Sequence, residues 1–309
     1  MKCVIWGTGG VGGYVAGALA ESGTEVVALT TRRHVTAIRE NGLRVIRDSG
    51  DYTFPLAGTS SDPAEVGPAD VVIATLKLYQ LAESLDDLGP LIGPDTVIVT
   101  LENGVAAPGM IAEAYPNAHV AAGLTTMVSY VEDAGVIRQV GGTPRVVVAQ
   151  SASDGVGAQT LARLVKAFDP GWVHASLSTD LQHDLWRKFA LIATFGGCCA
   201  LANATIGEVR DCPDTRDLLT RSLAEVQQVA AAEGVTLTDD DLASIEHTLT
   251  KMAPTGTTSM QRDLREGKPS ELDYLNGHLV DLAHAHDLSV QFHEIVTAVL
   301  RLHAARGHC

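Results

Sequence analysis

The amino-acid sequence predicts an α/β protein in which an N-terminal Rossmann dinucleotide-binding domain is followed by an all-α C-terminal domain. A glycine-rich turn lies between a strand-like and a helix-like segment near Met1, and further apolar, strand-like runs follow it. From Asp180 onward such runs nearly vanish and helical periodicity takes over. A length of 309 residues fits two domains. We place the boundary near Ser178, which gives a dinucleotide-binding domain over 1–178 and a helical substrate and dimerisation domain over 179–309.

The glycine-rich turn follows a predicted strand, Lys2–Trp6, and precedes a predicted helix, Tyr14–Glu21. Gly7, Gly9 and Gly12 fit the pattern G-x-G-x-x-G. The first glycine permits the tight turn, the second lets backbone approach a pyrophosphate, and the third lets helix and strand pack closely. The helix N-terminus then offers N–H groups and a partial positive charge to the phosphates. We expect a dinucleotide to bind at Gly7, Thr8, Gly9, Gly10, Val11 and Gly12.

The second strand, expected over Glu25–Leu29, is followed by two arginines instead of an acidic residue. An NAD-preferring fold places Asp or Glu about 20 residues past the glycine turn, to hold the ribose 2′-hydroxyl. No acid lies between Val26 and Arg39. A guanidinium suits a 2′-phosphate, so the sequence favours NADPH, with Arg32 preferred over Arg33 as the contact. The alternative is that both arginines are simply solvated.

Two further strands are expected to bring polar residues to the same edge of the sheet. Asp70–Leu76 and Thr96–Leu101 are continuous apolar runs of the kind buried in parallel sheets, and Lys77 and Asn103 follow them. Ligands of open α/β sheets bind outside the carboxyl ends of the strands. We therefore expect Lys77 and Asn103 to line the cofactor site, although either alone would be an ordinary loop residue.

The remaining elements follow from patterns of period two and of helical period. Strands within Val120–Gln150, expected to be antiparallel, and a helix over Ala152–Phe168 complete the first domain, and Pro170–Ser178 leads out of it. The second domain is expected to contain helices over Asp180–Ala202, Thr215–Glu233, Asp239–Lys251, Glu271–His286 and Val290–Ala305.

Composition argues against several classes of protein. Lys and Arg number 22 against 37 Asp and Glu, and the net charge of −15 argues against binding to nucleic acid or to anionic membranes. The five cysteines lack zinc spacing, so we interpret them as reduced thiols of a cytoplasmic protein. The longest uncharged run, Phe189–Gly207, is broken by glycines and is expected to be a buried helix and its exit, not a membrane span. No metal site is expected, because His284 and His286 point to different sides of a helix.

Lys188 is the first candidate for catalysis, because it lies in one of the most apolar helices expected in the chain. A semi-buried lysine has a lowered pKa, which suits proton donation to a developing alkoxide. The alternative is a structural lysine whose ammonium group reaches water. On a helix, Lys188 shares an otherwise apolar face with Ile192, Phe195, Gly196 and Cys199.

A second candidate stretch runs over Thr257–Gly277. Thr258 or Ser259 is expected to cap a helix, or to meet a carboxylate ligand with its hydroxyl. A Gly/Pro break follows, after which Ser270 is expected to cap the next helix. Glu271 would then lie in the first turn, where the macrodipole keeps a carboxylate ionised. The alternative for Glu271 is an ordinary acid at a helix start.

Six short pieces carry a resemblance that spans the chain in order: GTGGVG at 7–12, TLKLYQ at 75–80, ENG at 102–104, LWRK at 185–188, TSM at 258–260 and SELDYLNG at 270–277. Together they resemble the ketopantoate reductase (2-dehydropantoate 2-reductase) family. The resemblance implies a Rossmann domain joined to a helical domain, NADPH as cofactor, and a small carbonyl substrate. Ketopantoate, of pantothenate biosynthesis, is the first expectation, and a homodimer is one arrangement that stays open.

The resemblance also implies roles for the matching residues. Lys188 would donate a proton to the ketone while hydride attacks the carbonyl carbon. Asn103 would lie where nicotinamide and substrate meet. Lys77 and Glu271 would line the cofactor site, with Glu271 also near the substrate. Ser259 would contact the substrate, at its carboxylate.

The chain departs from the family's pattern at three positions. Ketopantoate enzymes usually carry Asn one turn after the lysine, another a turn later, and a third just before a Gly-Glu pair; this chain has Ile192, Gly196 and Ile206 there. Without those amides the pocket becomes more apolar, and such groups discriminate between substrates. Two alternatives stay open: a family member that reduces a less polar ketone or imine, and a non-catalytic NADP(H)-binding sensor. The expected substrate contacts are Asn103, Ile192, Gly196, Ile206, Thr258 and Ser259.

Overall fold

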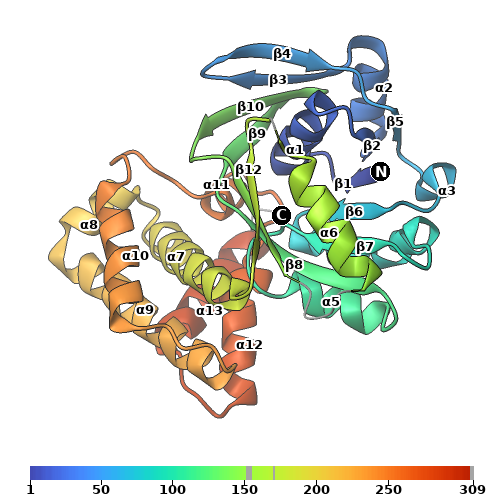
Figure 1. The fold of residues 1–309 in the computed structure, drawn as a ribbon. Coiled ribbons are helices and arrows are strands. Elements are labelled where there is room, and N and C mark those ends of the chain that lie inside the picture. Colours follow the sequence, from blue (N-terminus) through green and yellow to red (C-terminus); the bar gives the residue numbers. More distant parts are fainter. Residues whose placement is uncertain (151–154, 170, 307–309) are drawn as a thin grey trace. The chain divides into compact units, whose positions relative to one another are not determined.

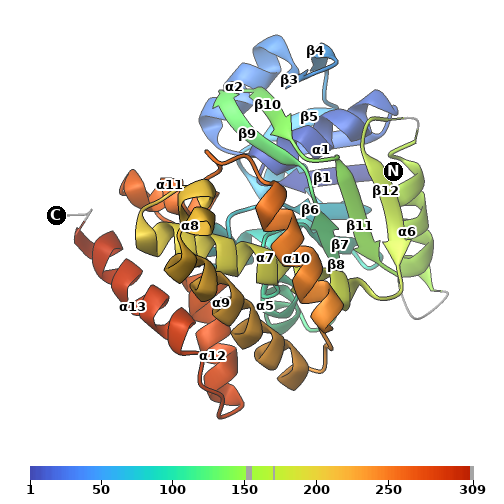
Figure 2. The ribbon, with the colours of Figure 1, turned by 90° about the vertical axis from the view of Figure 1, so that its left-hand side faces the viewer.

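The computed structural model describes residues 1–150, 155–169 and 171–306 and contains two compact units. Met1–Glu102 and Ala107–Leu181 form a unit built around β-sheets, and Asn103–Ala106 joins the chain from Gln182 onward in a helical unit. Figures 1 and 2 show the strands in the blue to yellow-green part of the chain and the helical unit in yellow to red. The predicted fold class is confirmed. The structure divides the chain after Leu181, three residues beyond the predicted boundary near Ser178.

An eight-stranded sheet forms the core of the first unit. Six of its strands are parallel, in the order β5-β2-β1-β6-β7-β8, which is the 3-2-1-4-5-6 order of a Rossmann fold. β11 then joins β8 in antiparallel fashion and β12 joins β11 in parallel. The strands are β1 Lys2–Trp6, β2 Glu25–Leu29, β5 Gly58–Ser60, β6 Val71–Ala74, β7 Val97–Thr100, β8 His119–Thr125, β11 Arg145–Ala149 and β12 His174–Ser178.

Two parts of this sheet differ from expectation. The antiparallel pairing expected within Val120–Gln150 is confirmed for β8 and β11, but on its other side β8 pairs with β7 in parallel, because helix α5 (Ala107–Ala114) carries the chain back across the sheet. The segment expected only to lead out of the domain contains β12. Its residues are mostly half-buried or exposed, so β12 lacks the apolar run that marks a central strand.

Helices flank the sheet, and the first begins earlier than predicted. α1 spans Gly10–Glu21, not Tyr14–Glu21, so its first turn includes glycines of the motif itself. The apolar groups packed between the helices and the sheet form one continuous core. The other helices of this unit are α2 Arg32–Asn41, α3 Pro63–Val66, α4 Leu78–Glu83, the 3₁₀ helix η1 Leu85–Leu91, α5 and α6 Val156–Lys166.

A second, four-stranded sheet covers α1. Its strands β9 and β10 lie within the antiparallel strands expected over Val120–Gln150 and pair antiparallel, whereas β3 and β4 were not predicted. Its order is β4-β3-β10-β9, and a Cβ at Gly13 of α1 would lie 2.5 Å from the Ile137 side chain of β10. The outer strands β4 and β9 are largely exposed and mix polar with apolar side chains, so they lack the continuous apolar run that reveals a buried strand. The strands are β3 Leu43–Arg47, β4 Gly50–Phe54, β9 Val128–Asp133 and β10 Val136–Gly141.

The helical unit packs around α7 (Leu181–Ala202), whose inner face belongs to a single hydrophobic core. By length and composition α7 could cross a membrane, but 56% of its most apolar window is buried inside the protein, as in the core helix of a soluble protein. The predicted helix over Glu271–His286 is instead a π-helical turn, η2, followed by α12. The other helices are α8 Ile206–Asp211, α9 Pro213–Ala232, α10 Asp239–Lys251, α11 Ser259–Arg265, η2 Asp273–Gly277, α12 His278–Ala285 and α13 Gln291–Arg306.

Candidate active site

The glycine-rich turn is held tightly at the carboxyl end of β1. Gly7 has φ = +93°, a conformation that only glycine adopts easily, and its N–H donates to the Leu29 carbonyl at 3.0 Å. The Thr75 hydroxyl donates to the Gly7 carbonyl at 2.7 Å. A Cβ at Gly12 would collide with Thr75 Oγ1 and with the Gly7 carbonyl. Gly7 and Gly12 are therefore required by the turn and by the close packing of α1.

The second glycine, Gly9, faces open space. A Cβ at Gly9 would meet no atom closer than the Gly7 carbonyl at 4.0 Å. The Gly13 N–H makes the first bond of α1, to the Gly9 carbonyl at 2.8 Å, so the N–H groups of Gly10, Val11 and Gly12 lie ahead of the intrahelical ladder. Backbone N–H groups at a helix start beside an unobstructed glycine suit phosphate oxygens.

Thr8 is placed differently from the glycines. Its side chain is buried, and its hydroxyl donates to the Ile5 carbonyl at 3.4 Å. Gly10 faces the small sheet, because a Cβ there would lie 2.5 Å from the Ser129 carbonyl. Both residues therefore have only backbone groups to offer a dinucleotide.

Other predicted cofactor residues follow neighbouring strands of the parallel sheet. Arg32 is the first residue of α2, after β2, and is exposed. Arg33 forms an exposed ion pair with Asp133 at 2.8 Å, so Arg32 is the better placed of the two for a ligand. Lys77 is the N-cap of α4, after β6. Asn103 follows β7 in the chain but belongs to the helical unit.

Lys188 lies in the first half of α7 and is half-buried, and its near neighbours in sequence, Trp186 and Phe189, are buried. Removal from water lowers the pKa of Lys188 to about 8, and the negative charge of Glu271 acts in the opposite direction. Such a group is mostly protonated at pH 7 but releases its proton more easily than an ordinary lysine. These are the properties of a general acid near neutral pH.

Glu271 is buried, with 2% of its surface exposed, but the structure does not place it in a helical turn. The predicted Ser270 cap was wrong, because the helical residues begin at Asp273 and Leu272 occupies the cap position. The Glu271 carbonyl accepts the Leu275 N–H at 2.9 Å, so the residue stands immediately ahead of η2.

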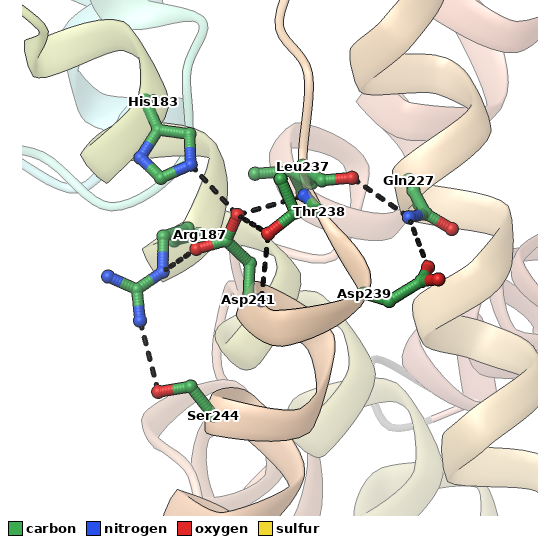
Figure 3. Close-up of polar contacts among 8 residues, drawn as sticks. All are labelled: His183, Arg187, Gln227, Leu237, Thr238, Asp239, Asp241 and Ser244. Carbon is green, nitrogen blue, oxygen red and sulfur yellow. Dashed lines mark hydrogen bonds and ion pairs between the residues drawn. The ribbon is translucent and has the colours of Figure 1, made fainter.

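Asp241 fastens the start of α7 to α10, as Figure 3 shows. Its carboxylate lies 3.0 Å from His183 Nε2 and 3.0 Å from Arg187 Nε, both on α7. The Thr238 N–H and hydroxyl also donate to it, at 2.9 and 2.7 Å. Ser244, one turn further along α10, accepts from Arg187 Nη2 at 3.1 Å. The turn of α7 that precedes Lys188 is thereby fixed.

The predicted substrate contacts fall into two groups. A Cβ at Gly196 would lie 3.8 Å from Thr258 Oγ1, so α7 and the start of α11 meet there. The Thr258 hydroxyl accepts the Gln261 N–H at 3.1 Å, and Ser259 is the half-buried first residue of α11. By contrast, Ile206 is fully buried within the helical core, and Ile192 is half-buried at its edge.

Sequence reasoning missed three buried polar residues of the helical unit. Gln261 donates through Nε2 to the Cys199 and Ala204 carbonyls at 3.0 and 2.8 Å. Asn276 and His293 are bonded to each other at 2.9 Å and have no exposed surface. Asn276 lies in the motif SELDYLNG, which was the available signal, whereas His293 has no distinguishing local pattern.

The Rossmann topology, the glycine turn and the half-buried lysine are typical of a nicotinamide-dependent oxidoreductase, and relatives of this chain are named as enzymes that act on a CH–OH group. The chain belongs to the ketopantoate reductase PanE/ApbA family. Residues 3–153 match the family's model "Ketopantoate reductase PanE/ApbA", and residues 180–304 match its C-terminal model. The predicted family is therefore confirmed, and members of this family use NADPH and act on a small keto acid.

Individual proteins extend this similarity over the whole chain. The chain is 29% identical over 303 residues to a 2-dehydropantoate 2-reductase of Halobacterium salinarum, covering 98% of each chain. It is similar to the crystal structure of a PanE/ApbA family ketopantoate reductase from Ralstonia eutropha JMP134, with a TM-score of 0.91, 28% identity and full coverage of both chains. D-mandelate dehydrogenase, solved with NADH and anilino(oxo)acetate, shares the fold at a TM-score of 0.87 and 23% identity, covering 100% of this chain and 99% of its own.

Proposed function

We propose that this protein is an NADPH-dependent reductase that converts the carbonyl of a 2-oxo acid to a hydroxyl group, with Lys188 as the proton donor. The observation that carries the proposal is the placement of Lys188, a half-buried lysine in the apolar helix α7; removal from water lowers its pKa to about 8, and the charge of Glu271 acts in the opposite direction. NADPH, when bound, supplies the hydride that attacks the carbonyl carbon. The Lys188 ammonium group gives its proton to the carbonyl oxygen, so that a 2-hydroxy acid leaves.

Burial and the charge of Glu271 shift the pKa of Lys188 in opposite directions. Burial favours the neutral amine that remains after the proton has been given away. The negative charge of Glu271 favours the ammonium form, so the group is protonated again before the next turnover at neutral pH. Glu271 is therefore proposed to keep Lys188 charged, while desolvation keeps it acidic enough to react.

The proposed cofactor site uses the glycine turn for the pyrophosphate and Arg32 for the 2′-phosphate. Lys77, Asn103 and Glu271 are proposed to contact the rest of the cofactor, with Asn103 at the junction with the substrate. The open space beside Gly9 supports the first assignment, and the exposed position of Arg32 as the first residue of α2 supports the second.

Ketopantoate is the first proposed substrate, with Thr258 and Ser259 as contacts. The Halobacterium relative carries the name of that activity. The alternative is a less polar ketone or imine, because Ile192, Gly196 and Ile206 offer no side-chain hydrogen bond. D-mandelate dehydrogenase, which has the same fold, was solved with the aromatic 2-oxo acid anilino(oxo)acetate. A cytoplasmic location and a homodimer through the helical unit complete the proposal.

A comparison of Lys188→Ala with Lys166→Ala tests the proposal, because Lys166 is an exposed lysine at the end of α6. NADPH oxidation is followed with ketopantoate and with aromatic 2-oxo acids, and NADPH affinity is measured by fluorescence. Lys188→Ala should lose at least about 100-fold in kcat and keep its affinity for NADPH, as expected for a lost general acid. An unchanged kcat would refute the donor role. Binding of NADPH without turnover of any carbonyl by the unmodified protein would favour the sensor.

The same panel separates the two substrate classes. Turnover of ketopantoate at a kcat/KM well above ~10⁴ M⁻¹s⁻¹ would support it as the substrate. A value far below this level, together with faster turnover of an aromatic or aliphatic 2-oxo acid, would favour the less polar alternative.

A further inference from the structure

The π-helical turn η2 links Glu271 to the core of the helical unit. Its defining bond runs from the Gly277 N–H to the Leu272 carbonyl at 2.9 Å, five residues apart. Turns of this kind are rare and are found frequently at functional sites. η2 begins two residues after Glu271, so whatever holds this turn also holds Glu271.

The Asn276 side chain fastens η2 to α7. Its Nδ2 atom donates to the Ala193 carbonyl of α7 at 3.1 Å and to His293 Nδ1 at 2.9 Å. The amide enters α7 at Gly197, where a Cβ would lie only 2.7 Å from Asn276 Nδ2. Glycine at this position therefore leaves the room that the amide occupies.

His293 fixes the orientation of that amide. The Ala193 carbonyl can only accept, which identifies the Asn276 atom facing it as nitrogen and makes His293 Nδ1 an acceptor. The Nε2 atom of His293 must then carry the hydrogen, and it lies 3.0 Å from Ser222 Oγ. Burial lowers the pKa of His293 to about 4, so the ring stays neutral at pH 7 and keeps this pattern. Ser222 continues the network to Thr194 of α7 at 2.9 Å.

We propose that Asn276 is a positioning residue for the pair formed by Lys188 and Glu271. Its amide locks the turn that follows Glu271 onto the same helix that carries Lys188, and the neutral His293 ring holds the amide in the required orientation. This inference rests on the proposed role of Lys188. Without the Asn276 amide, we expect the turn after Glu271 to shift, which moves Glu271 relative to Lys188.

Asn276→Leu and Asn276→Ser test the inference, with Ser222→Ala as the matched control. Ser222→Ala breaks the same buried network but leaves the bonds of Asn276 in place, and the Ser222 carbonyl, 3.4 Å from His293 Nε2, remains as an acceptor. Both Asn276 variants should lose about 10- to 100-fold in kcat, as expected for a reacting group displaced by about 1 Å. The pKa seen in their kcat profile should fall below that of the unmodified protein, because Glu271 no longer raises it.

Ser222→Ala should lower thermal stability but leave kcat and its pH profile unchanged. An Asn276→Ser protein with the pH profile of the unmodified enzyme would overturn the positioning role. So would a Ser222→Ala protein whose profile shifts as far as that of the Asn276 variants. Lys188→Ala distinguishes this outcome from failure of the proposed function, because a fully active Lys188→Ala protein would remove the donor role itself.

Discussion

Asp241→Asn should destabilise the helical unit by an amount that depends on pH. Burial opposes ionisation of Asp241, but hydrogen bonds from Thr238 and His183 outweigh it and hold the pKa at about 2, compared with an ordinary value of 3.8. The side chain is 14% exposed, so water screens these interactions only weakly. At 1.36 kcal/mol per pKa unit, the ionised carboxylate contributes about 2 kcal/mol to the free energy of unfolding at pH 7.

The sign of the pH dependence follows from the direction of this pKa shift. The pKa of Asp241 is lower in the folded state, so the stabilisation is complete well above 3.8 and is lost as the pH falls toward about 2. The difference in stability between Asp241→Asn and the unmodified protein should therefore be about 2 kcal/mol at pH 5–7. It should shrink to about 1 kcal/mol at pH 3.

Urea unfolding followed by circular dichroism at pH 3, 5 and 7 measures this difference. Asp239→Asn is the matched control, because Asp239 stands at the start of the same helix and receives only a 3.4 Å hydrogen bond from Gln227. It should change stability by less than about 0.5 kcal/mol at every pH. A constant difference between Asp241→Asn and the unmodified protein from pH 7 to pH 3 would refute the reasoning.

Three further predictions concern other parts of the chain. Burial lowers the pKa of His293 to about 4, from an ordinary value of 6.5. The free energy of unfolding should therefore fall by about 3 kcal/mol as the pH drops from 6.5 to 4. In urea unfolding, His293→Gln should show a smaller pH dependence than the unmodified protein, and equal pH dependences would contradict the assignment. Gly197→Ala should lower the free energy of unfolding by about 1–3 kcal/mol, because the added methyl group overpacks the core. Gly109→Ala, where the methyl group would meet open space on α5, should raise it by up to about 1 kcal/mol. If thermal unfolding ranked the two variants in the opposite order, the packing argument would be wrong. Arg32→Ala should weaken NADPH binding at least about tenfold more than NADH binding, and equal losses by fluorescence titration would exclude a 2′-phosphate contact.

The parallel strands were predictable because each is a local, self-contained pattern. β1 and β2 have the predicted bounds, since a strand buried on both faces is a continuous apolar run. The small sheet over α1 was not predictable in this way, because β3 pairs with β10, about 90 residues later in the chain. Its outer strands face water and carry mixed side chains, so their pairing depends on tertiary contacts that a local pattern does not contain.

The same difference between local and tertiary information explains which residues of the candidate site could be predicted. Lys188 could be identified because a single charge in an apolar helix is a local anomaly. Asn276 and His293 could not be assigned a role, because their bonds join η2, α7, α9 and α13, which are far apart in the chain. The π-helical turn was read as an ordinary helix because its residues have normal helical periodicity, and the extra residue per turn appears only in the backbone hydrogen bonds.

The two side-chain networks of the helical unit both restrict the motion of Lys188. A lysine side chain carries its ammonium group on a flexible stem of four carbon atoms, which does not hold the group in one position by itself. Asp241 fixes α7 through His183 and Arg187, on the N-terminal side of Lys188, and Asn276 fixes the same helix beyond it, at Ala193. Because the backbone is held on both sides, the position of the ammonium group depends on its own few torsions and on the charge of Glu271. The position of the ammonium group therefore depends on neutral and ionic bonds placed several residues away from the proposed proton donor.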